Sequence, residues 1–261
     1  MRKRIVSAII MLIILVPLII LGKIPFALGI GLISILAFRE IAKLNNYPII
    51  VNLLSFISLI SIVYSNFDSN NLVDGLNYKV ISLSLLLVLS PIVIYQTRNK
   101  YTIDDAFKLY AFIFLIGIGL NYLILIRDLD LKYFLYVLLI TIFTDTFAYF
   151  GGSLIGKHKL TKISPKKTIE GSIIGTTMST FMMTIYYVTI IGGSYNLLVV
   201  ILVTMLLSII GQIGDLFFSA IKRHYEIKDF SNLIPGHGGI LDRLDSLIFV
   251  SIAFMLFIRY M

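Results

Sequence analysis

The chain has 261 residues, of which 58% are hydrophobic and 14% are charged, and its mean hydropathy is +0.96. This balance excludes an ordinary soluble protein, because several segments approach the roughly 20 apolar residues needed to cross a bilayer. The absence of cysteine excludes disulfides, thiolate metal sites and cysteine nucleophiles. The net charge of +8 is not arranged as a basic stripe with interleaved aromatics, so we expect no nucleic-acid partner.

The apolar runs predict an all-α integral membrane protein with about nine transmembrane helices. We treat residues 1–261 as a single polytopic membrane domain. Residues 1–130 carry few polar groups inside their spans and are expected to be mainly scaffold, whereas 131–261 form the catalytic half. The spans are expected at about 5–21, 25–38, 49–64, 80–95, 107–126, 133–150, 171–192, 196–214 and 246–258.

The basic residues indicate the orientation of the spans. Three of them follow Met1 and precede an apolar run without a small-residue cleavage site, so we expect a retained first helix and not a secretory signal. With the N-terminus in the cytoplasm, the outer side keeps five of the 22 Lys and Arg residues and the inner side the other 17. The positive-inside rule expects this bias. The polar loops 151–170 and 215–245 then both face the cytoplasm.

Asp145 lies inside the sixth expected span. A carboxylate within the membrane is costly, and by default it marks a functional site. The alternative is a structural hydrogen bond with Thr144 or Thr146.

The loop 151–170 carries five lysines. They could hold the loop on the cytoplasmic side or bind anionic lipid headgroups. Ser164, followed by Thr168 and Glu170, is typical of a helix start, since an acid supports the first turn.

Asp215 closes the eighth expected span. If the helix continues, Ser219 and Lys222 lie four and seven residues further on, and all three share one face. A carboxylate, a hydroxyl and an ammonium in this order suit a metal ion with phosphate oxygens above it. The alternative is a face that only ends a helix.

Asp242 and Asp245 are three residues apart at the start of the ninth expected span. Two close carboxylates raise each other's pKa unless a cation lies between them. Arg243 points elsewhere and could bind a phosphate. The alternative is a solvated helix start, where acids are favoured in the first turn.

Three glycines, at 236, 238 and 239, surround His237. Glycine lets the backbone approach a ligand closely, and successive N–H groups can form an anion-binding nest. The alternative is a simple turn, and the residues alone assign no role to His237.

Together these residues resemble a known signature, that of the phosphatidate cytidylyltransferases, also called CDP-diacylglycerol synthases. The 27 positions from Ser219 to Asp245 show no departure from it. Its fixed positions here are Ser219, Lys222, Arg223, Lys228, Asp229, Ser231, Ile234, Pro235, His237, Gly238, Gly239, Ile240, Asp242, Arg243 and Asp245. A second set is similar to another conserved region of the family: Asp145, Ala148, Tyr149, Gly156, Lys157, Lys159, Leu160, Ser164, Pro165, Lys167, Thr168, Glu170 and Gly171.

The resemblance implies an enzyme that joins CTP to phosphatidic acid, giving CDP-diacylglycerol and pyrophosphate in phospholipid biosynthesis. It also implies Mg²⁺ as cofactor, with a second cation as an option, and a homodimer. The location implied is a bacterial-type inner membrane, with the active site facing the cytoplasm.

The resemblance also suggests roles for individual residues. The metal ligands would be Asp215, Asp242 and Asp245, and these acids with Lys222 and Arg223 would be catalytic. The substrate-binding residues would be Ser219, Lys228, Asp229, His237, Gly238, Gly239, Arg243, Asp145, Lys157, Lys159, Ser164, Lys167, Thr168 and Glu170.

Two other functions stay open. One is a CTP-dependent enzyme that acts on another lipid phosphate or on a polyprenol. The other is a cation transporter that uses Asp145, Asp215 and Asp242 as an ion path. It is less favoured, because transporters often have related halves, and the halves of this chain look unlike each other.

Overall fold

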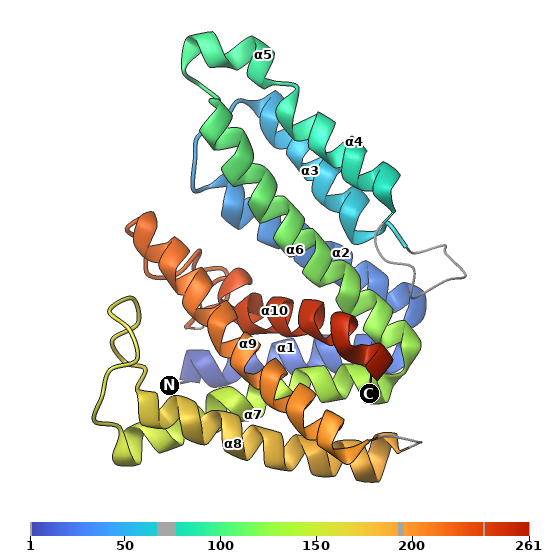
Figure 1. The fold of residues 1–261 in the computed structure, drawn as a ribbon. Helices are drawn as coiled ribbons and strands as arrows, with labels where there is room; N and C mark the ends of the chain where they lie inside the picture. The colour runs from blue at the N-terminus through green and yellow to red at the C-terminus, as the bar shows by residue number, and fades with distance from the viewer. Residues whose placement is uncertain (1, 67–76, 193–195, 237, 261) are drawn as a thin grey trace. The chain divides into compact units, whose positions relative to one another are not determined.

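The structure is a computed structural model, and it describes residues 2–66, 77–192, 196–236 and 238–260. The all-α prediction is confirmed for this part of the chain, which contains helices, two isolated β-bridges and no strand. Figure 1 shows α1 (Arg2–Leu21), α2 (Lys23–Ala42), α3 (Ile49–Val63), α4 (Tyr78–Leu89), α5 (Ile92–Tyr95), α6 (Ile103–Leu129), α7 (Leu131–Ile155), α8 (Ile169–Tyr186), α9 (Leu197–His224) and α10 (Leu241–Phe257). Short 3₁₀ or π turns follow α5, α8 and α10 at Gln96–Arg98, Tyr187–Ile191 and Ile258–Tyr260.

The helices form where the sequence is apolar, because a helix satisfies its own backbone hydrogen bonds in lipid. Within the described residues, six are long and apolar enough to cross a membrane: Lys23–Ala42, Tyr78–Arg98, Ile103–Leu129, Leu131–Ile155, Ile169–Ile191 and Leu197–His224. Ile9–Leu21 and Ile49–Val63 are shorter apolar helices. The count of nine spans and the cytoplasmic N-terminus therefore stay predictions.

Polar residues mark where three helices of the second half begin. The side chain of Asp130 accepts a hydrogen bond from Lys132 N at the start of α7. Thr168 caps α8 and Asn196 caps α9 in the same way. Each side-chain oxygen satisfies an N–H group that the helix itself leaves unpaired.

The chain forms two compact units, which are described separately. The first is Met1–Leu129 with Phe230–Leu241, and the second is Asp130–Asp229 with Asp242–Met261. In the first unit, α3 packs between α4 and α6, and α2 packs on α6 (Figure 1). Hydrogen bonds to backbone carbonyls join distant helices, as between Asn121 Nδ2 and Val63 O at 2.8 Å.

The second unit is built from α7, α8, α9 and most of α10. Helices α7 and α8 pack along their length (Figure 1). They approach closely at Gly175, where an added Cβ would lie 2.7 Å from the carbonyl oxygen of Thr144. The ring of Phe249 on α10 contacts the rings of Phe217 and Phe218 on α9. The packing of these helices positions the polar side chains of the candidate site.

A polar stripe runs along α9, where Thr204, Ser208 and Gln212 recur every four residues and therefore share one face. All three are buried. A buried polar group inside a membrane requires a hydrogen-bond partner. The partners on α7 and α8 are, in order, Tyr136 (2.6 Å), Thr144 (2.8 Å) and Thr176 (2.8 Å). This stripe fixes α9 against α7 and α8 and leads directly to Asp215.

Candidate active site

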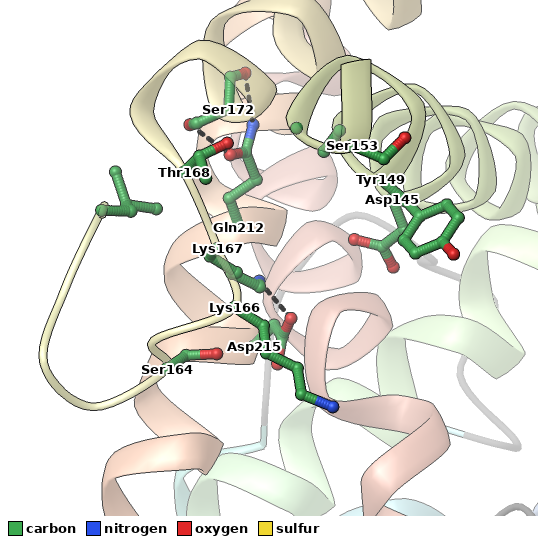
Figure 2. A pocket seen from close by; sticks show the side chains of 13 residues that line it. Asp145, Tyr149, Ser153, Ser164, Lys166, Lys167, Thr168, Ser172, Gln212 and Asp215 are labelled. Atoms are coloured by element: carbon green, nitrogen blue, oxygen red, sulfur yellow. Dashed lines mark hydrogen bonds and ion pairs between the residues drawn. The ribbon is translucent and has the colours of Figure 1, made fainter. Parts of the chain in front are cut away.

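A cavity of about 410 Å³ opens in the second unit between α7, α8, α9 and the loop that joins α7 to α8 (Figure 2). Both carboxylates and ammonium groups face it. Asp145 and Tyr149 come from α7, Lys166 and Lys167 from the loop, and Gln212 and Asp215 from α9. A cavity that combines lysines with acids at the end of apolar helices suits a polyanion and a metal ion.

Asp215 forms an ion pair with Lys167 in this cavity (Figure 2). Helix α9 does continue past Asp215, and Ser219 Oγ, one turn further on, donates a weak hydrogen bond to Asp215 Oδ1 across 3.4 Å. The two side chains therefore share the face expected from their spacing. Lys167 is two residues before the first residue of α8, so the cap at Thr168 helps to fix its place.

Asp145 lies on the cavity wall of α7. Among the described residues, the structural alternative, a hydrogen bond from Asp145 to Thr144 or Thr146, is not seen, and the hydroxyl of Thr144 bonds to Ser208 Oγ at 2.8 Å. The charge of Asp145 interacts with those of Lys167, Asp215 and Arg243. The structure thus places Asp145 close enough to Asp215 for their charges to interact.

Asp245 approaches Asp215 because α9 and α10 pack closely. At Gly214, an added Cβ would lie 2.8 Å from the backbone oxygen of Asp245. The charges of Asp245, Asp215 and Asp145 interact with one another. Asp245 Oδ1 also accepts a hydrogen bond from Ser246 N at 2.7 Å. Three helices therefore each bring one acid to this region.

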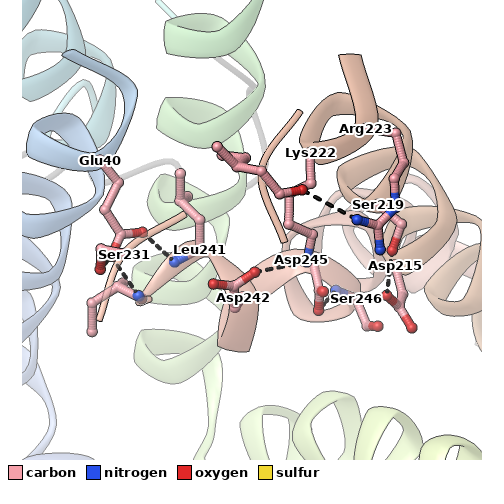
Figure 3. Close-up of polar contacts among 12 residues, drawn as sticks. Glu40, Asp215, Ser219, Lys222, Arg223, Ser231, Leu241, Asp242, Asp245 and Ser246 are labelled. Atoms are coloured by element: carbon pink, nitrogen blue, oxygen red, sulfur yellow. Dashed lines mark hydrogen bonds and ion pairs between the residues drawn. The ribbon is translucent and has the colours of Figure 1, made fainter. Parts of the chain in front are cut away.

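Asp242 pairs with a lysine. Lys222 Nζ donates to Asp242 Oδ1 across 2.7 Å, and the two side chains are only 11% and 4% exposed (Figure 3). The pair joins the last turn of α9 to the first turn of α10. Burial of a carboxylate is tolerated when a close cation and hydrogen bonds compensate its charge.

A magnesium ion typically binds to one or two carboxylates and completes its shell with substrate phosphates and water. Asp215 and Asp245, with interacting charges, supply such a pair. Within the described residues, no three His, Cys, Asp or Glu side chains are gathered as a metal cluster. Asp242, the third expected ligand, instead pairs with Lys222.

Glu170 organises the loop between α7 and α8. Its carboxylate accepts hydrogen bonds from Lys157 N at 3.1 Å and His158 N at 3.2 Å, and it contacts His158 Nδ1 at 2.6 Å. Through these contacts, Glu170 holds the start of the loop in place. The side chains of Lys157 and Lys159 are exposed and do not line the cavity, whereas those of Ser164, Lys167 and Thr168 do.

The remaining expected residues are dispersed. Arg223 Nε donates a long hydrogen bond of 3.4 Å to Ile163 O in the loop, and Lys228 and Asp229 lie exposed after α9. Gly238 pairs with Ile234 in a short antiparallel bridge of the first unit. Gly239 is buried in that unit, and Arg243 is exposed on α10. His237 lies outside the described residues.

Sequence reasoning missed several residues. Gln212 and Ser172 line the cavity and bond to each other, and Tyr149 and Lys166 also line it. Gln212 carried a usable signal, because it extends the four-residue spacing of Thr204 and Ser208 in an apolar run. Glu40, a buried acid near the end of α2, had no comparable signal in the sequence.

The site and the apolar helices define an integral membrane enzyme, and comparison with known proteins identifies its family. A model described as "Cytidylyltransferase family" matches residues 2–261. A phosphatidate cytidylyltransferase from Staphylococcus haemolyticus is 36% identical over 253 residues, which cover 96% of each chain. Proteins of the same name from Bacillus subtilis and Staphylococcus aureus are each 35% identical, over 96% of this chain and 94% and 96% of theirs.

The chain therefore belongs to the cytidylyltransferase family and is a nucleotidyltransferase enzyme. The resemblance that the sequence carried between Ser219 and Asp245 is confirmed at the level of the family.

Proposed function

We propose that this chain transfers the cytidylyl group of CTP to phosphatidic acid, giving CDP-diacylglycerol and pyrophosphate in phospholipid biosynthesis. The observation that carries the proposal is the cavity in which Lys167 meets Asp215, within a chain whose relatives bear that name. In this reaction a phosphate oxygen of the lipid forms a bond to the α-phosphorus of CTP. The bond from that phosphorus to the β-phosphate bridging oxygen breaks, and pyrophosphate leaves with the electron pair.

The chemistry requires little from a general base, because the lipid phosphate is already anionic near neutral pH. The difficulty lies in bringing two anions together and in stabilising the charge on the leaving group. Lys166 and Lys167 on the cavity wall would bind phosphate oxygens, and Lys222 and Arg243 would add positive charge. Asp145 and Gln212, which also line the cavity, would orient the bound groups.

The same proposal includes Mg²⁺ held by Asp215 and Asp245, with Asp242 as the third expected ligand. When bound, the ion would neutralise charge on the triphosphate and the leaving pyrophosphate. Each of Asp215 and Asp242 forms an ion pair with a lysine whose ammonium group can also bind phosphate. A second cation in the site is part of the proposal.

We further propose that the site faces the cytoplasm, in a bacterial-type inner membrane, and that the enzyme is a homodimer. The distribution of basic residues supports the orientation, since soluble CTP and membrane-bound phosphatidic acid must meet at one surface. The homodimer rests on the family resemblance alone.

Product identity tests the function and separates it from its nearest alternative. The purified protein is incubated with CTP, phosphatidic acid and Mg²⁺, and the products are identified by mass spectrometry. CDP-diacylglycerol with pyrophosphate supports the proposal. A phosphorylated polyprenol with CDP, or transfer only to another lipid phosphate, would replace it with the alternative.

A further inference from the structure

Glu40 is a buried carboxylate in the half of the chain that the sequence suggested was scaffold. It lies near the end of α2, and the residue is 2% exposed. Burial of a charged carboxylate costs several kcal/mol unless hydrogen bonds and nearby positive charge compensate it. The contacts of Glu40 within the first unit show what compensates it.

Donors from the Phe230–Leu241 segment surround the Glu40 carboxylate (Figure 3). Oε1 accepts from Ser231 Oγ at 2.6 Å and from Ile240 N at 2.8 Å. Oε2 accepts from Leu241 N at 2.9 Å. Both oxygens are therefore used, and two of these donors are backbone groups about 200 residues away in the chain.

These two backbone groups stand at the beginning of α10. The first N–H groups of a helix lack partners inside the helix and usually bond to a capping side chain. The residue before α10 is Ile240, whose aliphatic side chain cannot accept a hydrogen bond. Glu40 supplies the missing acceptor from another helix, and the positive end of the helix dipole favours its charge.

Gly239 gives a second, independent indication of the same contact. An added Cβ at this position would lie 2.5 Å from Glu40 Oε1. Real Cβ atoms do not approach an oxygen so closely, so a side chain at 239 would require the hydrogen-bonded carboxylate to move. The contact with Glu40 therefore gives a structural reason for glycine at this position.

We infer that Glu40 is a positioning residue that sets where α10 begins and thereby holds Asp242 and Asp245 in its first turns. Asp242 follows Leu241 directly, so a helix start that frays at Leu241 also disturbs the pairing of Asp242 with Lys222. The link to catalysis rests on the proposed function, whereas the capping itself does not.

Hydrogen–deuterium exchange tests the capping without any assay of activity. In the wild-type protein in detergent, the amides of Ile240 and Leu241 should exchange at least about tenfold more slowly than the exposed loop amide of Asn232. Equal rates in the wild type would overturn the inference, whether or not any variant folds. In Glu40→Gln, which keeps the shape but replaces one carboxylate oxygen with an NH₂ group, at least one of the two amides should exchange about tenfold faster. Unchanged exchange would overturn it.

A double-mutant cycle tests the exclusion between Glu40 and Gly239. Gly239→Ala should lower thermal stability in the wild-type background and cost much less in Glu40→Ala, where the carboxylate is absent. Equal losses in the two backgrounds would contradict the contact. Ser231→Ala is the matched control, since it removes one donor and leaves both backbone bonds, and it should change exchange less than threefold.

Activity then separates positioning from general structural damage. Per folded molecule, Glu40→Gln should lower kcat for CDP-diacylglycerol formation by about tenfold or more and leave the KM for CTP within about threefold. Loss of folded protein at unchanged kcat would refute the positioning role. Absence of activity in the wild type would refute the proposed function and leave the exchange result standing.

Discussion

Lys222 and Asp242 form an ion pair of 2.7 Å between the last turn of α9 and the first turn of α10, and both side chains are almost fully buried. The family signature contains both residues but does not indicate that they contact each other. The pair connects the two helix ends that carry the proposed metal ligands. A phosphate oxygen could bind the ammonium group of Lys222 in place of the Asp242 carboxylate or together with it.

Removal of the Lys222 charge should be more harmful than removal of the pair. In Lys222→Met, Asp242 stays buried without its cation, and the free energy of unfolding should fall by about 3–5 kcal/mol. The double variant Lys222→Met, Asp242→Asn should recover most of this stability and none of the activity. Thermal unfolding in detergent measures the first effect, and Lys100→Met is the control for an exposed lysine. Equal stabilities of the single and double variants would contradict a buried, charged pair.

Two lysines of the same loop should behave differently. Lys167 lines the cavity and pairs with Asp215, whereas Lys159 is exposed outside it. Lys167→Met should raise the KM for CTP by about tenfold or more, because it removes a charge-assisted contact to phosphate. Lys159→Met should stay within about twofold of the wild type. Steady-state kinetics measure the KM for CTP in both variants. An equal change in KM would show that the nucleotide does not bind in this cavity.

Close packing of α9 on α10 should be required for activity. Gly214→Ala places a methyl group 2.8 Å from the backbone oxygen of Asp245 and forces the two helices apart. The expected result is a loss of about 1–3 kcal/mol in stability and a lower kcat. Ile213→Ala, at a neighbouring half-exposed position, is the control and should affect kcat little. A fully active Gly214→Ala variant would disprove the need for this approach.

The cysteine-free chain allows a clean test of orientation. Single cysteines replace Lys162 in the loop 151–170 and Lys79 at the start of α4. A membrane-impermeant maleimide applied to intact cells should label Lys79→Cys, and Lys162→Cys only after the cells are opened. The opposite pattern would place the cavity loop outside and reject the proposed cytoplasmic site.

The sequence predicted the helices well and the contacts between them less well. Apolar runs and charged breaks located the helices, because an apolar segment in lipid satisfies its backbone hydrogen bonds as a helix. Asp145 was singled out because a carboxylate is costly inside an apolar span, and Asp215 and Asp245 because they lie at helix ends on shared faces with other polar residues. The pairing of Lys167 with Asp215 depends on how a loop folds back, and no local pattern encodes it.

Glu40 shows the same limit more sharply. Its partners include two backbone N–H groups and one hydroxyl, about 200 residues away, and no side-chain motif in the sequence connects backbone groups to Glu40. The division into two units was likewise hidden, because Phe230–Leu241 leaves the second unit and joins the first in the middle of the signature.

Asp215 provides the most direct test of the central claim that this cavity carries out metal-assisted cytidylyl transfer. Wild type, Asp215→Asn and the control Asp104→Asn, an exposed acid at the start of α6, are purified and shown to unfold at similar temperatures. The rate of CDP-diacylglycerol formation from CTP and labelled phosphatidic acid is then measured with and without Mg²⁺. We expect a Mg²⁺-dependent rate in the wild type and Asp104→Asn, and a loss of at least about a thousandfold in Asp215→Asn. A near-normal rate in Asp215→Asn would contradict the account.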